Sequence, residues 1–231
     1  MGRVATLFGR AVAANNRVVA RADPETSNPR DADRLEWHRR LAASTPRIAA
    51  EWSAFADAGG RLPRIEDVLG EGQGNEGPWR MGLLVDHGRT TELARRHFPA
   101  TVAALAGIPG LAAALWSVLE PGTELGAHRG PNAGVLRYHL GIDCPDGAAL
   151  RVGDVVVPYR DGEGVLFDDT AVHEAWNHGD RPRVTLFCEV VRPLPPVAAG
   201  RNRALQFALS RDPRRRAGVV RADEWYAALN P

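Results

Sequence analysis

Hydrophobic and polar residues alternate with two different periods along this chain, one before and one after residue 110. Between Asp31 and Ala58, apolar side chains recur every three or four residues, which predicts amphipathic helix. Pro46 is tolerated only in the first turn of a helix, so we expect it to divide this region into two helices. The same periodicity over 90–106 predicts one further helix, which ends before the Gly and Pro that follow.

Beyond residue 110, short runs rich in Val, Leu, Tyr and Phe are separated by turn-forming clusters. The runs are ALWSVLE, GVLRYHLGI, LRVGDVVVPY, GVLFDDTAV and RVTLFCEVV, and the separators are PGTELG, DCPDG, RDGEG and NHGDRP. Such close spacing is typical of an antiparallel sandwich or barrel. Helices followed by strands therefore predict an α+β fold, in which N-terminal helices pack against a double-stranded β-helix (a cupin-like jelly roll).

The predicted organisation has three parts. Residues 1–30 form a loosely ordered segment, residues 31–199 form one domain, and residues 200–231 form a basic, helical tail. Within the domain, 31–110 give helical support and 111–195 give the jelly roll. The tail is expected to be a solvated face or a packing arm. The glycine-rich stretch at 70–78 lacks the preceding strand and the following helix of a phosphate-binding loop, so a flexible loop is expected there.

Composition narrows the function classes. Of 231 residues, 44% are hydrophobic and 25% are charged, as in ordinary globular domains. A formal net charge of +1 gives no overall basic field, so a nucleic-acid partner is not expected. The N-terminus resembles no signal peptide, and no apolar stretch approaches the roughly 20 residues of a membrane span. Cys144 and Cys188 match no zinc-site spacing, and a reduced, cytoplasmic protein is expected.

Two of the predicted strands carry charged residues on one face. In GVLRYHLGI, strand alternation places Arg137 and His139 on the same side, opposite Leu136, Tyr138 and Leu140. In RVTLFCEVV, it places Arg183 on the side of Thr185, Phe187 and Glu189. Buried arginines need an anionic partner, so these faces either are exposed to solvent or line a lumen that binds an anion. We favour the lumen.

Histidine spacing then suggests a metal site. HEAWNH places its histidines five apart, which does not fit a metalloprotease helix. His178-Gly179-Asp180 has the H-x-D form of an iron triad, but no later His follows it, so we expect a turn there. His128 and His173 remain, 45 residues apart, and Arg183 follows the second by ten. Ten residues span a turn and return on the next strand, which would direct the guanidinium into the same cavity as the metal, where it suits a carboxylate.

The segments PGTELGAHRGP, GVLRYHLGI, FDDTAVHEAWN and RVTLFCEVVRPLP resemble the aspartyl/asparaginyl β-hydroxylase family. The resemblance covers about residues 79–195. It implies an Fe(II)- and 2-oxoglutarate-dependent dioxygenase in which two histidines, here His128 and His173, hold the iron. The usual third ligand, a carboxylate two residues after the first His, is replaced by Gly130, and water is expected there, with Asp169 accepting its hydrogen bond.

The resemblance also implies the cosubstrate contacts. Arg183 would pair with the distal carboxylate of 2-oxoglutarate, assisted by Ser117, while Arg137 and His139 would lie near the other carboxylate or the substrate acid. The expected reaction consumes dioxygen and gives succinate and CO₂. Its expected target is an unactivated C–H bond, first the β-carbon of an aspartyl or asparaginyl residue or of a related amino acid.

Three alternatives remain open. The substrate could be a lipid acyl chain or a secondary metabolite. The protein could instead be a cupin-type metal enzyme that does not use 2-oxoglutarate, or a ligand-binding β domain without catalysis. The sequence does not determine the oligomeric state or choose between a protein and a small-molecule substrate.

Overall fold

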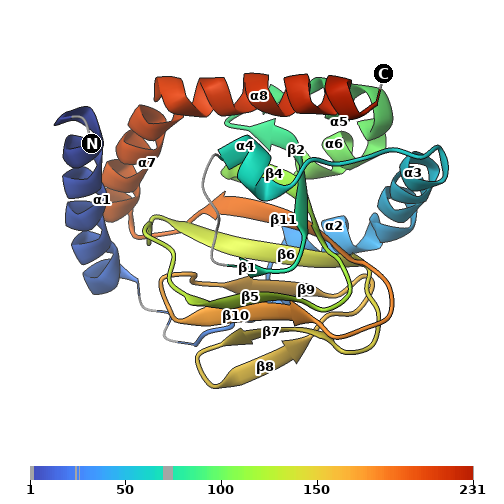
Figure 1. Cartoon of the computed structure of the whole chain (residues 1–231). Helices are drawn as coiled ribbons and strands as arrows, with labels where there is room; N and C mark the ends of the chain where they lie inside the picture. Colours follow the sequence, from blue (N-terminus) through green and yellow to red (C-terminus); the bar gives the residue numbers. More distant parts are fainter. Residues whose placement is uncertain (1–2, 24, 26, 70–74, 231) are drawn as a thin grey trace.

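A computed structural model describes residues 3–23, 25, 27–69 and 75–230 (Figure 1). Within them, two antiparallel sheets lie face to face. The larger sheet has the order β3-β2-β4-β11-β6-β9, and the smaller has the order β1-β5-β10-β7-β8. The strands of the larger sheet are Trp79–Asp86 (β2), Arg89–Thr90 (β3), Leu111–Leu119 (β4), Val135–Asp143 (β6), Gly164–Phe167 (β9) and Arg183–Val191 (β11). Those of the smaller sheet are Asn75–Glu76 (β1), Thr123–His128 (β5), Ala148–Val152 (β7), Val155–Pro158 (β8) and His173–Asn177 (β10).

The connectivity is that of a jelly roll. From β4 to β11 the chain crosses repeatedly between the two sheets, and β11 returns between β4 and β6 with antiparallel pairing on both sides. This arrangement confirms the predicted double-stranded β-helix within an α+β fold. It also places residues that are far apart in sequence on the two walls of one lumen.

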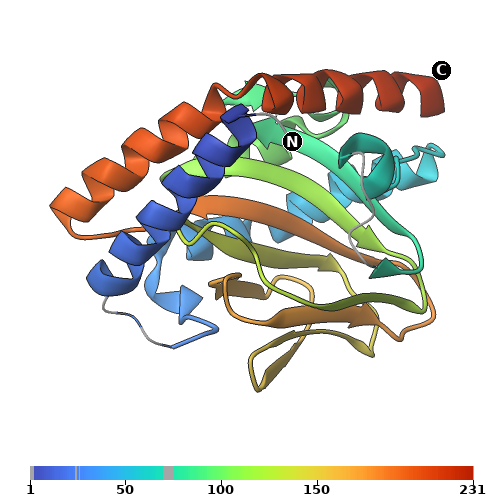
Figure 2. The same cartoon turned by 60° about the vertical axis from the view of Figure 1, so that its left-hand side comes forward.

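Helices cover the outer face of the larger sheet (Figures 1 and 2). They are Glu36–Ala43 (α2), Thr45–Asp57 (α3), Glu92–His97 (α5) and Pro99–Leu105 (α6), with the 3₁₀ turn Ala32–Arg34 beside them. Apolar side chains from these helices pack against Trp116, Tyr138 and Leu186 of the sheet to form the main core. Pro46 lies in the first turn of α3, as predicted.

The region at 90–106 is two helices and not one. Thr91 caps α5 by accepting a hydrogen bond from the Ala94 amide at 3.3 Å. Phe98 leaves helical geometry at φ −130°, and Pro99 then begins α6. The expected single helix is therefore wrong, because Pro99 has no amide hydrogen to continue the α5 ladder.

Two further expectations are corrected. Residues 1–30 were expected to be loosely ordered, but Arg3–Ala22 form helix α1, which lies beside α7 (Pro196–Ser210) in both views (Figure 2). The helical support expected at 31–110 also contains β2, which extends the larger sheet beyond β4. Of the glycine-rich stretch at 70–78, residues 70–74 lie outside the described residues.

The C-terminal tail is helical, as predicted, and it packs on the domain. Helix α7 leads to α8 (Pro213–Leu229), which runs across the top of Figure 1 above β2 and the short helix α4 (Ile65–Leu69). Because α8 and α4 cover the β2 side of the larger sheet, they extend the lumen beyond the jelly roll.

Candidate active site

A cavity of about 620 Å³ opens between the two sheets and continues beneath α4 and α8. This volume is within the range of small-molecule sites. All seven residues predicted to act in the site line this cavity: Ser117, His128, Arg137, His139, Asp169, His173 and Arg183. The lumen hypothesis is therefore confirmed over solvent exposure for both charged strand faces.

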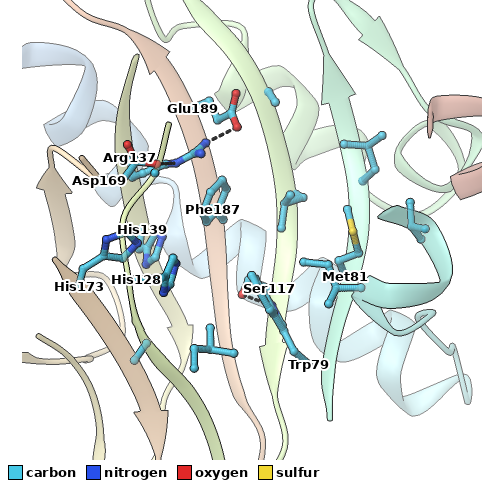
Figure 3. A pocket seen from close by; sticks show the side chains of 18 of the residues that line it. Trp79, Met81, Ser117, His128, Arg137, His139, Asp169, His173, Phe187 and Glu189 are labelled. Atoms are coloured by element: carbon cyan, nitrogen blue, oxygen red, sulfur yellow. Dashed lines mark hydrogen bonds and ion pairs between the residues drawn. The ribbon is translucent and has the colours of Figure 1, made fainter. Parts of the chain in front are cut away.

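His128 and His173 are direct partners across two neighbouring strands. His128 ends β5 and His173 begins β10, and the two residues face each other in the antiparallel register. Their ring centroids lie 4.2 Å apart (Figure 3). The sequence predicts a turn at PGTELG, just before His128. The structure places it at the end of a strand that is largely polar and exposed, a pattern that hides a strand from sequence periodicity.

Both imidazoles have the same tautomer for the same reason. Nδ1 of His128 lies 2.8 Å from the Gly126 carbonyl, and Nδ1 of His173 lies 3.0 Å from the Ala171 carbonyl. A carbonyl oxygen only accepts, so Nδ1 must donate in each ring, and the lone pair is on Nε2. Burial also lowers the pKa of His173, which favours its neutral form. Imidazoles that are held through Nδ1 and present Nε2 to a cavity are suitable metal ligands.

Asp169 occupies the space that a side chain at position 130 would need. A Cβ added to Gly130 would lie 2.1 Å from Oδ2 of Asp169, and the Gly130 amide donates to the Asp169 backbone carbonyl at 2.7 Å. The Asp169 carboxylate, which comes from the β9–β10 connection, therefore lies where a side chain at position 130 would otherwise be. Oδ1 of Asp169 is buried and has no partner in the described residues, so it is free to accept a hydrogen bond.

Arg137 is neutralised by two carboxylates. Its Nε donates to Asp169 Oδ2 at 2.7 Å, and its Nη1 pairs with Glu189 (Figure 3). Burial tends to lower the pKa of Arg137, but Glu189 and Asp169 outweigh it and raise that pKa. Burial likewise tends to raise the pKa of Glu189, but Arg137 and Arg215 hold it below its ordinary value. Arg137 was predicted to bind a carboxylate of the ligands. In the structure its carboxylate partners are internal, and a ligand contact stays a prediction.

Arg183 is a buried cation whose charge is not balanced. Its side chain is 1% exposed, and among the described residues no carboxylate pairs with it. Nη1 donates to Thr185 Oγ1 at 2.6 Å, the guanidinium lies 4.9 Å from the centre of the Tyr159 ring, and Nε has no partner. Burial lowers the pKa of Arg183. A buried guanidinium of this kind is a ready site for an anionic ligand.

His139 and Ser117 add two further polar groups to the lining of the cavity. His139 Nδ1 lies 2.7 Å from the Tyr159 hydroxyl, while its Nε2 is buried without a partner. Burial, followed by Arg183 and Arg137, holds the pKa of His139 well below its ordinary value, so the ring is neutral. The Ser117 hydroxyl accepts a hydrogen bond from Trp79 Nε1 at 3.0 Å, which leaves its own hydrogen to donate. Tyr159 and Trp79 were not predicted, since nothing in their local sequence marks them.

The cavity also has an apolar arm, although charged residues such as Asp86, Arg215 and Arg221 line the cavity as well. The arm follows the inner face of β2 and β4 away from the histidines and is roofed by α4 and α8. Cross-strand pairing sets Met81 beside Ser117 and Leu83 beside Leu115, which lengthens the apolar surface from the polar end. The residues that line the arm are Ile65, Val68, Met81, Leu83, Leu115 and Val219.

The remaining histidines have side-chain partners within the fold. His38 bonds to Tyr138, His87 to Asp86 and His97 to Tyr226. His178 follows β10 and bonds to Glu124, so its H-x-D motif belongs to a turn. Both cysteines are free thiols. No group of three or more His, Cys, Asp or Glu side chains in the described residues could hold a metal, and no described helix is long and apolar enough to cross a bilayer.

Comparisons with known proteins agree with the sequence motifs. A family model described as aspartyl/asparaginyl beta-hydroxylase matches residues 42–193. An ornithine lipid ester-linked acyl 2-hydroxylase from Rhizobium tropici is 36% identical over 200 residues, covering 84% of this chain and 71% of that protein. The human aspartyl/asparaginyl beta-hydroxylase is 28% identical over 171 residues, but the match covers only 22% of that longer protein against 71% of this chain.

Among solved structures, a predicted oxalate decarboxylase from Thermotoga maritima aligns with a TM-score of 0.38 and 15% identity. The alignment covers 57% of this chain and 92% of that one.

Proposed function

Because this chain belongs to the aspartyl/asparaginyl β-hydroxylase family, we propose that it is a hydroxylase that holds Fe(II) through His128 and His173 and uses 2-oxoglutarate and dioxygen. The strongest support is that one cavity combines a pair of facing imidazoles, each with Nε2 free, and a buried arginine without a carboxylate partner in the described residues. The first group suits a divalent transition metal, and the second suits a dicarboxylic acid.

Each polar group has a role that its contacts support. The backbone carbonyls behind His128 and His173 fix the ring orientation, and Asp169 Oδ1 is free to accept a hydrogen bond from water beside the metal. Arg183 and the Ser117 hydroxyl would receive the distal carboxylate of 2-oxoglutarate. With the Tyr159 hydroxyl donating to Nδ1, His139 would carry its hydrogen on Nε2 and donate it into the cavity.

When bound together, iron, 2-oxoglutarate and dioxygen supply the oxidising chemistry, in which 2-oxoglutarate becomes succinate and CO₂ and one oxygen atom enters a substrate C–H bond. The chain itself supplies orientation and shelter from water. Phe187 of β11 and Leu115 of β4, which pair across the sheet, line the cavity and limit the room for bulk water beside the reacting carbon.

For the substrate, the apolar arm favours an aliphatic chain over the carboxylate of an aspartyl residue. Met81, Leu83, Leu115 and Val219 offer no hydrogen bond to a carboxylate but suit a hydrocarbon. A lipid acyl chain is therefore the preferred substrate class, and the relative from Rhizobium tropici, described as an acyl 2-hydroxylase, gives it independent support. Aspartyl or asparaginyl β-hydroxylation is the second candidate.

An anaerobic titration with Fe(II) and then 2-oxoglutarate tests the cofactors. A visible charge-transfer band should form in the wild type and be lost in His173→Ala. Aerobic incubation with an acyl lipid should then yield succinate and a product heavier by one oxygen atom. Metal binding without any succinate would instead support a cupin-type enzyme that does not use 2-oxoglutarate.

Filling the arm tests the substrate class. Leu83→Trp should abolish oxygen transfer to an acyl lipid but preserve decarboxylation of 2-oxoglutarate without substrate, whereas Leu83→Ala should preserve both reactions. If Leu83→Trp oxidises an acyl lipid normally, the arm does not hold the chain. Turnover of an aspartyl peptide in place of the lipid would establish the second candidate.

A further inference from the structure

A second cavity, of about 540 Å³, lies at the corner between α7 and α8. It is enclosed by the end of α7, the start of α8 and the turn between β2 and β3. We call it the corner cleft and define it by the residues that line it: His87, Arg89, Phe207, Ser210, Arg211, Pro213 and Arg216. The proposed hydroxylase site uses none of them.

The corner cleft concentrates positive charge. Arg89, Arg211 and Arg216 all line it, and none of the described residues that line it is acidic. No carboxylate of the described residues pairs with any of these three guanidinium groups. Because all three line one cleft, an anion bound there would be attracted by more than one guanidinium group.

Two nitrogen atoms at the cleft have no hydrogen-bond partner in the described residues. They are Nη1 of Arg89 and Nε2 of His87, and both are buried from solvent. Buried polar groups are nearly always satisfied in folded proteins. Unlike Arg215, which bonds to Asp86 at 3.0 Å, Arg89 has no partner among the described residues, and its side chain is only partly buried, so a small rotation would bring the guanidinium to an external acceptor.

The turn that carries these groups is held in a specific shape. His87 has a φ of 47° and Gly88 a φ of 78°, so both central residues of the β2–β3 turn are left-handed. A histidine at such a position is uncommon and costs free energy. Its ring is anchored by Nδ1, which bonds to Asp86 Oδ1 at 3.1 Å, and Nε2 is left on the opposite side of the ring.

We propose that the corner cleft binds the phosphate group of a phosphate ester. Guanidinium groups bind phosphate oxygens through paired hydrogen bonds, and the first residue of α8, Pro213, lies at the helix end that attracts anions. The cleft is far larger than one phosphate ion, and Phe207, 61% exposed under the Arg211 guanidinium, offers an apolar surface to the rest of the ligand. The ester is a lipid headgroup or a small soluble molecule.

The position of the cleft connects it to the main cavity. Asp86 and Arg215, which pair with each other, line the main cavity, while their neighbours His87 and Arg216 line the corner cleft. A ligand in the cleft would therefore contact the outer side of the wall that separates the two spaces. This proposal does not depend on the identity of the hydroxylase substrate.

Binding to the full-length chain tests the site, with two arms that separate the sources of phosphate. In one arm, glycerol 3-phosphate is titrated at fixed ionic strength and followed by calorimetry, with 2-oxoglutarate present to fill the main cavity. In the other, sedimentation with phosphatidylglycerol–phosphatidylcholine vesicles is compared with sedimentation with phosphatidylcholine alone. The test variant is Arg211→Ala/Arg216→Ala. The matched control is Arg201→Ala/Arg203→Ala, which removes two exposed arginines of α7 that do not line the cleft.

We expect at least tenfold weaker binding in the test variant and less than a twofold change in the control, with thermal unfolding the same in both. Loss of glycerol 3-phosphate binding would assign a soluble ester, and loss of vesicle binding alone would assign a lipid headgroup. Equal loss in both variants would show non-specific attraction to arginine and overturn the proposal. Failure of the wild type to bind in either arm would also overturn it. If Arg211→Ala/Arg216→Ala does not fold, Arg89→Gln gives the same test from the β2–β3 turn.

Discussion

Two arginines, the partly buried Arg137 and the fully buried Arg183, face the same cavity and differ in how their charge is balanced. Arg137 of β6 has carboxylates on both sides, Asp169 and Glu189, and its positive charge is neutralised within the fold. Arg183 of β11 donates a hydrogen bond to the Thr185 hydroxyl and lies over the Tyr159 ring, but it pairs with no carboxylate among the described residues. The same residue type on adjacent strands is thus paired with carboxylates of the fold in one place and open to a ligand in the other.

The difference shows that burial alone does not identify a ligand-binding arginine. Both guanidinium groups are enclosed, yet the pKa of Arg137 is raised by its carboxylates while burial lowers that of Arg183. A cation that the fold itself does not stabilise stays ready to pair with a ligand. Substitutions at the two positions should therefore fail in different ways.

The largest expected effect is a loss of stability when Arg137, the arginine that is paired with carboxylates, is replaced. Arg137→Leu leaves the buried Asp169 carboxylate without its cation and leaves the partly buried Glu189 with only Arg215, 4.0 Å away, which should lower the free energy of unfolding by about 3–5 kcal/mol. Denaturant titration measures this directly. Arg151→Leu is the matched control, because its partner Glu174 is partly exposed and surface pairs contribute only about 0–1 kcal/mol. Equal losses in the two variants would show that the Arg137 pairs are not structural.

Replacement of Arg183 should have the opposite effect on stability. Arg183→Leu removes a buried charge that no described carboxylate balances, so the melting temperature without cosubstrate should stay the same or rise. Affinity for 2-oxoglutarate should fall by roughly 100-fold, since truncating one member of a buried charged pair costs about 2–5 kcal/mol. Succinate formation against 2-oxoglutarate concentration gives the KM. A destabilised variant with an unchanged KM would assign Arg183 to the frame.

Low pH should reduce the stability that the Arg137–Glu189 ion pair contributes. The pKa of Glu189 in the folded state is below its ordinary value of 4.5, so its contribution to stability is full above that value and is lost as the pH falls through the folded pKa. Unfolding free energies measured between pH 6 and pH 3 should fall more steeply in the wild type than in Glu189→Gln. The difference in slope should be at most about 1.4 kcal/mol per pH unit. Parallel curves would rule out this contribution.

Strand alternation in the sequence was sufficient to orient the site residues. A period of two placed Arg137 and His139 on one face of β6, and Arg183 and Glu189 on one face of β11, and both faces line the cavity. The jelly roll also followed from the short runs and turns. These features are local, because each depends only on residues close together in the chain.

The carboxylate partners of Arg137 could not be predicted from the sequence in the same way. Glu189 meets Arg137 because the β11–β6 register sets these two residues opposite each other, and Asp169 arrives from the β9–β10 connection. Register and long-range connections are properties of the folded sheet. Without knowledge of this register, the family resemblance implied a ligand-binding role for both Arg137 and Arg183. The sequence also predicted a turn at PGTELG, just before His128, because β5 has too few apolar residues to reveal its period.

The smallest expected effect concerns the hydroxyl that accompanies Arg183. Ser117→Ala removes one hydrogen-bond donor to the 2-oxoglutarate carboxylate, which should raise the KM about fivefold, equivalent to about 1 kcal/mol. The same change deprives Trp79 Nε1 of its acceptor, so Trp79→Phe serves as the control. Trp79→Phe keeps the Ser117 hydroxyl and should leave the KM within about twofold of the wild type, because only the donor to Ser117 is lost. If instead Trp79→Phe raises the KM as much as Ser117→Ala, the serine would act by holding the indole in place, and Arg183 would be the sole anchor for the carboxylate among these groups.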